Sequence, residues 1–392
     1  MRKVLLLGVC LAAATGGISA AQAADTNVTS GLSLKISGWI GFLAGLSLSN
    51  TDDDSFDRDY DFASNARLQF DVKNVTDSGL EYGARIRMNN VDRRNDVTVD
   101  RTYVYLKGSF GIVTLGDAPY AIGDFGYVYA HDTLNGKLGF GAGWGDGLDG
   151  KFSLFGGSDT FYAFDPTYGI GGLNGKDTKV KYTSPGFSGF SFGIDFTPVA
   201  GGNIHAGNTG RNDLFNNNGT PLVSNDDVRY ENIVTGGVQY TDTFDGSTVT
   251  LRGSAGTGNG VSGNHDYEAY SLGGQLVHAS GFAASVNWVH FSSTFRADKA
   301  IDSITGDLSY ASGPYVISLG YAYTTAEKNN GLESSFTDGE DLKTNHSASL
   351  SFLYNLAPGL GSFTELVYEK NEFRIGQDYE STALTTGVVL AF

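Results

Sequence analysis

Basic side chains recur at every second position in the first half of the sequence, with apolar residues between them. Arg85 and Arg87 alternate with Ile86 and Met88, for example. The basic residues on the polar faces of such alternating segments are Arg67, Arg85, Arg87, Arg101, Lys179 and Lys181. In a strand such positions share one face, so the pattern predicts either a charged wall beside water or structural ion pairs between neighbouring strands.

Acidic residues follow the four arginines and precede the two lysines, at the start of a long segment between two apolar-alternating stretches. Asp117, Asp124 and Asp132 belong to positions 117–176. If this segment hangs opposite the basic wall, rows of opposite charge face each other across a narrow throat. Fixed charges at such a throat set ion preference, and their field favours small polar solutes over apolar ones.

The sequence contains one weak candidate for a catalytic pair of side chains. His290 and Ser292 would share a strand face, as a base and a nucleophile require, but no acidic or amide partner that would orient His290 can be assigned. The remaining histidines do not cluster at the spacing of metal ligands. The sequence predicts no enzyme, and a barrel hydrolase remains a remote alternative.

One acidic run could hold a cation. Asp52, Asp53 and Asp54 are followed by further aspartates, and carboxylate oxygens are ligands for Ca²⁺. The spacing lacks the central glycine of a Ca²⁺ loop, so a solvated loop is the preferred interpretation. No other cofactor is predicted.

Alternation of apolar and polar residues continues to the end of the chain. It predicts sixteen strands, at 32–49, 61–73, 80–90, 98–106, 111–117, 177–183, 190–199, 230–242, 247–256, 266–278, 282–295, 301–310, 315–325, 343–356, 362–370 and 379–392. Short connections alternate with long, Asp/Asn/Gly-rich ones. An even strand count with short turns at one rim is typical of a closed antiparallel β-barrel that crosses a membrane. A soluble β-sandwich is the alternative.

The two ends of the sequence carry targeting features. Arg2 and Lys3 precede an apolar run, and Ala21-Gln22-Ala23 is a signal-peptidase site. We therefore expect a signal peptide at 1–23 and a single barrel domain at 24–392, with no apolar run of the ~20 residues that a spanning helix needs. The last strand ends in Phe392, which we expect to act as an assembly signal.

Composition narrows the class further. The chain has 392 residues, a net charge of −17, 55 glycines and one cysteine, Cys10, which lies inside the predicted signal. Disulfides are thereby excluded from the exported chain. The negative charge argues against nucleic-acid binding and predicts a preference for cations.

Two stretches, 101–117 (RTYVYLKGSFGIVTLGD) and 179–193 (KVKYTSPGFSGFSFG), resemble Gram-negative general-diffusion porins, particularly the alphaproteobacterial type. The resemblance implies a sixteen-stranded barrel, a homotrimer, and a third extracellular loop folded into the lumen, here 118–176. Gly123-Asp124-Phe125-Gly126 resembles the turn at that loop's tip. The loop is longer than the family usually carries, so an extra hairpin at 148–156 and 160–164 would give eighteen strands, as in sugar-specific porins.

Together these features predict an outer-membrane channel for passive diffusion of ions and small hydrophilic solutes, with cations preferred. A sugar-selective channel is the alternative. Expected partners are two further copies of the chain, outer-membrane lipid with lipopolysaccharide, and the barrel-assembly machinery.

Overall fold

The computed structural model describes residues 26–29, 31–50, 60–89, 98–126, 128, 177–200, 230–261, 263–293, 297–332 and 338–392. The predicted signal peptide, the acidic run Asp52 to Asp54, Asp132 and the possible hairpin at 148–156 and 160–164 lie outside these residues. No described helix is long and apolar enough to cross a membrane.

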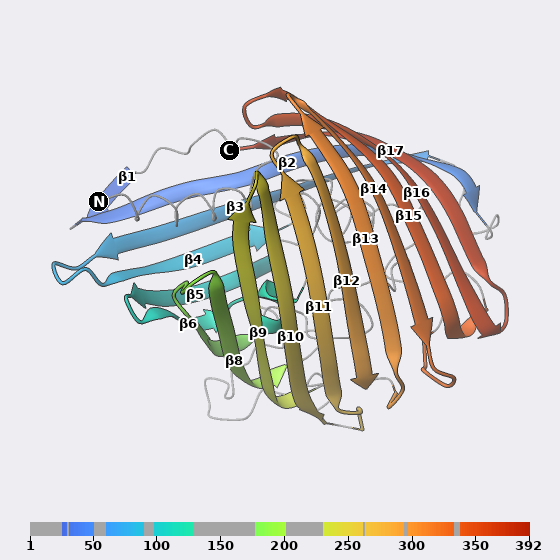
Figure 1. The fold of residues 1–392 in the computed structure, drawn as a ribbon, viewed down its shortest axis with the longest axis horizontal. Coiled ribbons are helices and arrows are strands. Elements are labelled where there is room, and N and C mark those ends of the chain that lie inside the picture. Colours follow the sequence, from blue (N-terminus) through green and yellow to red (C-terminus); the bar gives the residue numbers. More distant parts are fainter. Residues whose placement is uncertain are drawn as a thin grey trace.

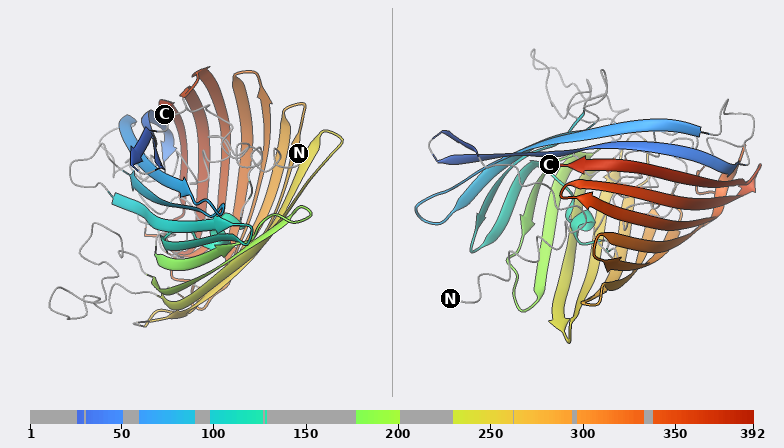
Figure 2. Two further views of the ribbon diagram at one scale, coloured as in Figure 1. Left: turned by 90° about the vertical axis from the view of Figure 1, so that its left-hand side faces the viewer. Right: turned by 90° about the horizontal axis from the view of Figure 1, so that it is seen from above.

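The described strands form a closed antiparallel barrel (Figure 1). Their bounds are β1 (Thr26–Thr29), β2 (Leu32–Asn50), β3 (Tyr60–Val75), β4 (Glu81–Asn89), β5 (Thr98–Gly108), β6 (Gly111–Asp117), β7 (Thr178–Thr183), β8 (Phe190–Ala200), β9 (Tyr230–Phe244), β10 (Ser247–Gly260), β11 (Tyr267–His278), β12 (Phe282–Ser293), β13 (Ile301–Ser312), β14 (Tyr315–Ala326), β15 (Glu340–Ala357), β16 (Leu360–Ile375) and β17 (Tyr379–Ala391). Each strand from β2 to β16 pairs with the next, and β17 pairs with β2. Figure 2 shows the red β17 beside the blue β2, where the ring closes.

The ring confirms the sixteen predicted strands and excludes the eighteen-stranded alternative. β6 pairs directly with β7 across the long connection, through partners such as Thr114 and Lys181. Since every other neighbouring pair is also hydrogen-bonded, no further strand fits into the wall. The short β1, which pairs with the start of β2, was not predicted and does not take part in closure.

The two faces of the wall differ in chemistry. On β14, Tyr315, Ile317 and Leu319 are exposed, while the intervening Val316 and Ser318 are buried. The same division runs round the ring, where exposed apolar residues point outward. Soluble proteins rarely expose apolar surface on this scale, whereas a membrane barrel requires it. The soluble β-sandwich alternative is therefore wrong.

The residues of the turns explain why the connections at one rim of the barrel are short. Asp245 and Gly246 join β9 to β10, and both have positive φ, 46° and 73°, as a two-residue hairpin of type I′ requires. The connections at the opposite rim are longer, and the one between β6 and β7 contains the short helix α2 (Ala121–Asp124). This helix contacts β8, β9 and β10.

Candidate functional site

Four predicted arginines gather on the inner face of β3, β4 and β5. Arg87 lies directly opposite Arg101 on the neighbouring strand, and Arg85 lies opposite Tyr103. Arg67 follows on β3, opposite Asn89 of β4. Their outward neighbours Ile86 and Val104 are exposed apolar residues. Strand alternation alone therefore places this arginine row (Arg67, Arg85, Arg87 and Arg101) on the lumen side.

Neighbouring side chains hold the row in place. Arg85 Nε lies 2.6 Å from Asp71 Oδ1, and its guanidinium lies 5.8 Å from the Tyr103 ring centre. Arg67 donates to Asn89 Oδ1 at 2.6 Å and lies 5.6 Å from the Trp39 ring centre. Such contacts restrict the guanidinium without removing its charge. Arg85 thus takes part in a structural ion pair while it still faces the interior.

Lys179 and Lys181 lie on the inner face of β7 but are buried beneath the start of the long connection. Lys181 Nζ donates to the carbonyl of Pro119 at 3.0 Å and to Asp124 Oδ2 at 2.6 Å. Lys179 Nζ donates to the carbonyls of Ala118 and Asp177. The structure thus buries these two lysines, together with the nearby Arg101, and the lysine charges bind the connection to the wall.

Tyr120 completes this attachment. Its hydroxyl donates to Asp177 Oδ2 at 2.6 Å, and Lys179 Nζ lies 4.0 Å from its ring centre. Burial, followed by the adjacent Asp177 carboxylate, raises the pKa of the Tyr120 phenol well above its usual value. The phenol therefore remains a hydrogen-bond donor.

The helix α2 is fixed to β8 and β9 by two residues that were not predicted. Asp195 Oδ2 accepts hydrogen bonds from the backbone N–H of Ala121 and from Thr235 Oγ1, the latter at 2.7 Å. Thr235 Oγ1 in turn accepts from the N–H of Ile122 at 3.0 Å. These N–H groups are ones that a helix start leaves without partners. Strand alternation indicates that Asp195 and Thr235 face inward, but not that a backbone segment packs on them.

Further along, the connection reaches β12. Asn287 accepts from the N–H of Val128 at 2.8 Å and donates to the carbonyl of the same residue at 2.8 Å. The described part of the connection therefore runs inside the barrel from β6 past β8, β9 and β10 to β12. This arrangement agrees with the expected fold of the third loop into the lumen.

Two glycines receive the aromatic ring at the end of α2. A methyl group added to Gly193 would lie 2.6 Å from the ring of Phe125, and one added to Gly237 would also collide with Phe125. These positions on β8 and β9 have no side chain where Phe125 needs space. We call them the Phe125 seat.

The predicted acidic row is only partly assembled. Asp124 pairs with Lys181 in the attachment just described. Asp117 lies opposite Thr102 on the outward face and accepts a hydrogen bond from Thr178 at 2.5 Å, so the structure does not place it opposite the arginines. Asp117 lies two residues after the exposed Leu115, so strand alternation puts both side chains on the outward face.

His290 lies on the outward face of β12, in line with the exposed Val286. Its Nδ1 is 2.9 Å from Asp302 Oδ1, which also accepts from Trp288 Nε1 at 2.9 Å. No hydrogen bond joins His290 to Ser292 among the described residues. Nor does the described part of the chain contain three His, Cys, Asp or Glu residues that could hold one metal ion.

The carboxyl-terminal residue closes the ring. The N–H of Phe392 donates to the carbonyl of Gly38 at 3.0 Å, and its carbonyl accepts from the N–H of Gly38 at 2.9 Å. The predicted assembly signal is thus the last pair of the contact between β17 and β2.

One comparison identifies the family, and another identifies solved structures with the same fold. The profile described as "Gram-negative porin" matches residues 8–374. Solved structures with the same fold include the anion-selective porin from Comamonas acidovorans (15% identity, 92% of this chain and 100% of that chain, TM-score 0.56). The outer membrane channel DcaP of Acinetobacter baumannii (11%, 94% and 100%, 0.58) and OmpT of Vibrio cholerae in a trimer form (13%, 93% and 100%, 0.56) are also similar. No curated protein matches the sequence.

Proposed function

This chain belongs to the Gram-negative porin family, and from that premise we propose that its outer-membrane barrel is a water-filled, non-catalytic pore for passive diffusion of ions and small hydrophilic solutes. The observation that carries the proposal is the closed ring with apolar residues outside and the arginine row inside. A charged interior wall is unfavourable unless water or fixed partners solvate it. The loop attached across the lumen would set the width of the passage.

The preferred ion is part of the proposal. The net charge of −17 favours cations at the pore mouths, while the arginine row favours anions inside. We propose a weak overall preference for cations, reduced by the arginines. The Comamonas neighbour is anion-selective by its description, but at 15% identity it supports only the fold.

Assembly and targeting complete the proposal. We assign a cleavable signal to residues 1–23, the alphaproteobacterial type on the two resembling stretches, and a homotrimer in contact with lipopolysaccharide. The barrel-assembly machinery would recognise Phe392. At Asp52, Asp53 and Asp54 a solvated loop stays the preferred prediction, with a Ca²⁺ site as the alternative, and no other cofactor is proposed.

The decisive experiment is planar-bilayer recording with the purified protein. Stepwise conductance that rises linearly with KCl concentration is expected, and sugars should not block it. Saturable block by one sugar would replace general diffusion with the sugar-selective alternative. Protein that inserts without conducting would overturn the pore itself.

A further inference from the structure

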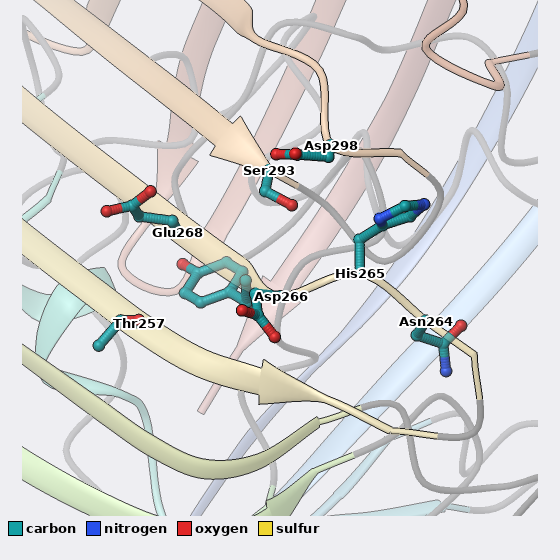
Figure 3. A pocket seen from close by; sticks show the side chains of 8 residues that line it. Thr257, Asn264, His265, Asp266, Glu268, Ser293 and Asp298 are labelled. Carbon is teal, nitrogen blue, oxygen red and sulfur yellow. The ribbon is translucent and has the colours of Figure 1, made fainter.

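A polar cavity lies at the long-loop rim, between the end of β10, the start of β11 and the connection after β12 (Figure 3). Its volume is about 480 Å³, within the range of roughly 300–1,000 Å³ that suits small organic ligands. Glu268, which lines it, shares a face of β11 with the exposed Leu272. The buried Tyr267 and Ser293 also line the cavity, so it lies at the rim of the wall and takes residues from both faces of the strands.

Three carboxylates line this cavity: Asp266, Glu268 and Asp298. Asp266 Oδ1 accepts from the N–H of Gly260 at 2.8 Å, and Glu268 Oε1 accepts from the hydroxyl of Tyr270 at 2.6 Å. These bonds orient both carboxylates. Each keeps a second oxygen that accepts no hydrogen bond from the described residues. No lysine or arginine occurs among the described lining residues.

Ser293 gives an independent indication of a ligand. It ends β12, lines the cavity, and is only 5% exposed. Its Oγ has no hydrogen-bond partner among the described residues, although buried polar groups normally have one. Figure 3 shows Ser293 next to Asp298 among the side chains that line the cavity. A bound molecule would supply the missing partner.

We propose that this cavity binds an aliphatic diamine or polyamine from the external medium. Ammonium groups donate three hydrogen bonds and accept none, which matches a lining rich in acceptors, and bonds between ionised groups are the stronger kind. A flexible chain with several amines can reach carboxylates that stand apart. A single metal ion fits less well, because no three described His, Cys, Asp or Glu residues could hold one. A neutral sugar would leave the carboxylates uncompensated.

The test is isothermal titration of the full-length protein, folded in nonionic detergent at low salt, with spermidine. Saturable binding of one spermidine per chain is expected. Asp266→Asn and Asp298→Asn should each weaken it about tenfold, and Ser293→Ala should weaken it less. Glu340→Gln is the matched control, since Glu340 is an exposed carboxylate that starts β15 at the same rim outside the cavity, and its affinity should not change.

Equal affinity in Asp266→Asn, Asp298→Asn and Glu340→Gln would overturn the proposal, as would the absence of saturable binding. Stronger saturable binding of glucose or of MgCl₂ alone than of spermidine would also overturn it. Heat-modifiable migration on gels identifies folded variants. If Asp266→Asn does not fold, Asp298→Asn still decides, because Asp298 is an exposed residue of a connection.

Discussion

Arg85 and Lys181 both face the interior, yet they contribute differently. Arg85 remains about one-third exposed, whereas the Lys181 side chain is 9% exposed beneath the loop. An ion in the passage therefore experiences the charge of Arg85 more directly than that of Lys181 or of the buried Arg101. A unit charge about 8 Å from an ion in water contributes roughly 0.5 kcal/mol, which is close to a twofold change in local ion concentration.

Replacing both Arg85 and Arg87 by Gln should thus move the channel toward cations. Removing each charge should raise the local cation concentration and lower the local anion concentration about twofold, so the cation-to-anion permeability ratio, measured from the reversal potential in a KCl gradient, should rise by up to about sixteenfold. Lys343→Gln is the control, because Lys343 pairs with Glu372 away from the arginine row. An equal shift in that control would mean that the arginines do not line the passage.

Asp195 and Thr235 should hold the loop in place. Asp195→Ala leaves the buried N–H of Ala121 without its acceptor, at a cost of about 1–3 kcal/mol, and Thr235→Val removes the acceptor for Ile122. We expect noisier single-channel current and faster entry of larger sugars in liposome swelling. Thr250→Val is the control, since Thr250 is also buried on the inner face, and among the described residues its hydroxyl bonds to Thr241 rather than to the loop. Quiet, unchanged channels in Asp195→Ala would contradict this role.

At the scale of elements, β17 closes the barrel by pairing with β2, and Phe392, directly after β17, adds the last pair of this contact. Deleting Phe392 removes both hydrogen bonds to Gly38, so we expect a lower yield of heat-modifiable protein in the outer membrane. Phe392→Ala retains the backbone pair and removes only the ring. A similar loss in both variants would assign the effect to the ring, and Phe192→Ala, an outward phenylalanine elsewhere, should leave the yield unchanged.

The strands were the most predictable elements. Alternation is a local property, and it gave the sixteen strands of the ring and the inward face of the arginines. It could not give β1, whose four residues are too few to show a pattern. Alternation also could not show that the long connection buries Lys179 and Lys181, or that α2 packs on Asp195 and Thr235. These contacts depend on a loop that is distant in sequence from the strands it packs against.

At the scale of the whole molecule, the outward apolar face must meet either lipid or another copy. We expect copies to meet near the closing seam, where Ile40, Phe42 and Leu390 are exposed. Phe42→Asp should therefore release monomers in native mass measurements. Leu308→Asp on β13 places the same charge on the lipid-facing side away from the seam, and it should reduce membrane yield without changing the oligomer. Trimers that persist in Phe42→Asp would place the contact elsewhere.

At the Phe125 seat, replacing one glycine hydrogen atom by a methyl group should change the permeability of the cell envelope. Gly193→Ala or Gly237→Ala would displace Phe125 and, with it, the segment that we propose narrows the passage. A bacterium exposed to a bulky toxic solute would therefore need one point mutation, and no change in strand pairing, to alter the size limit of this pore.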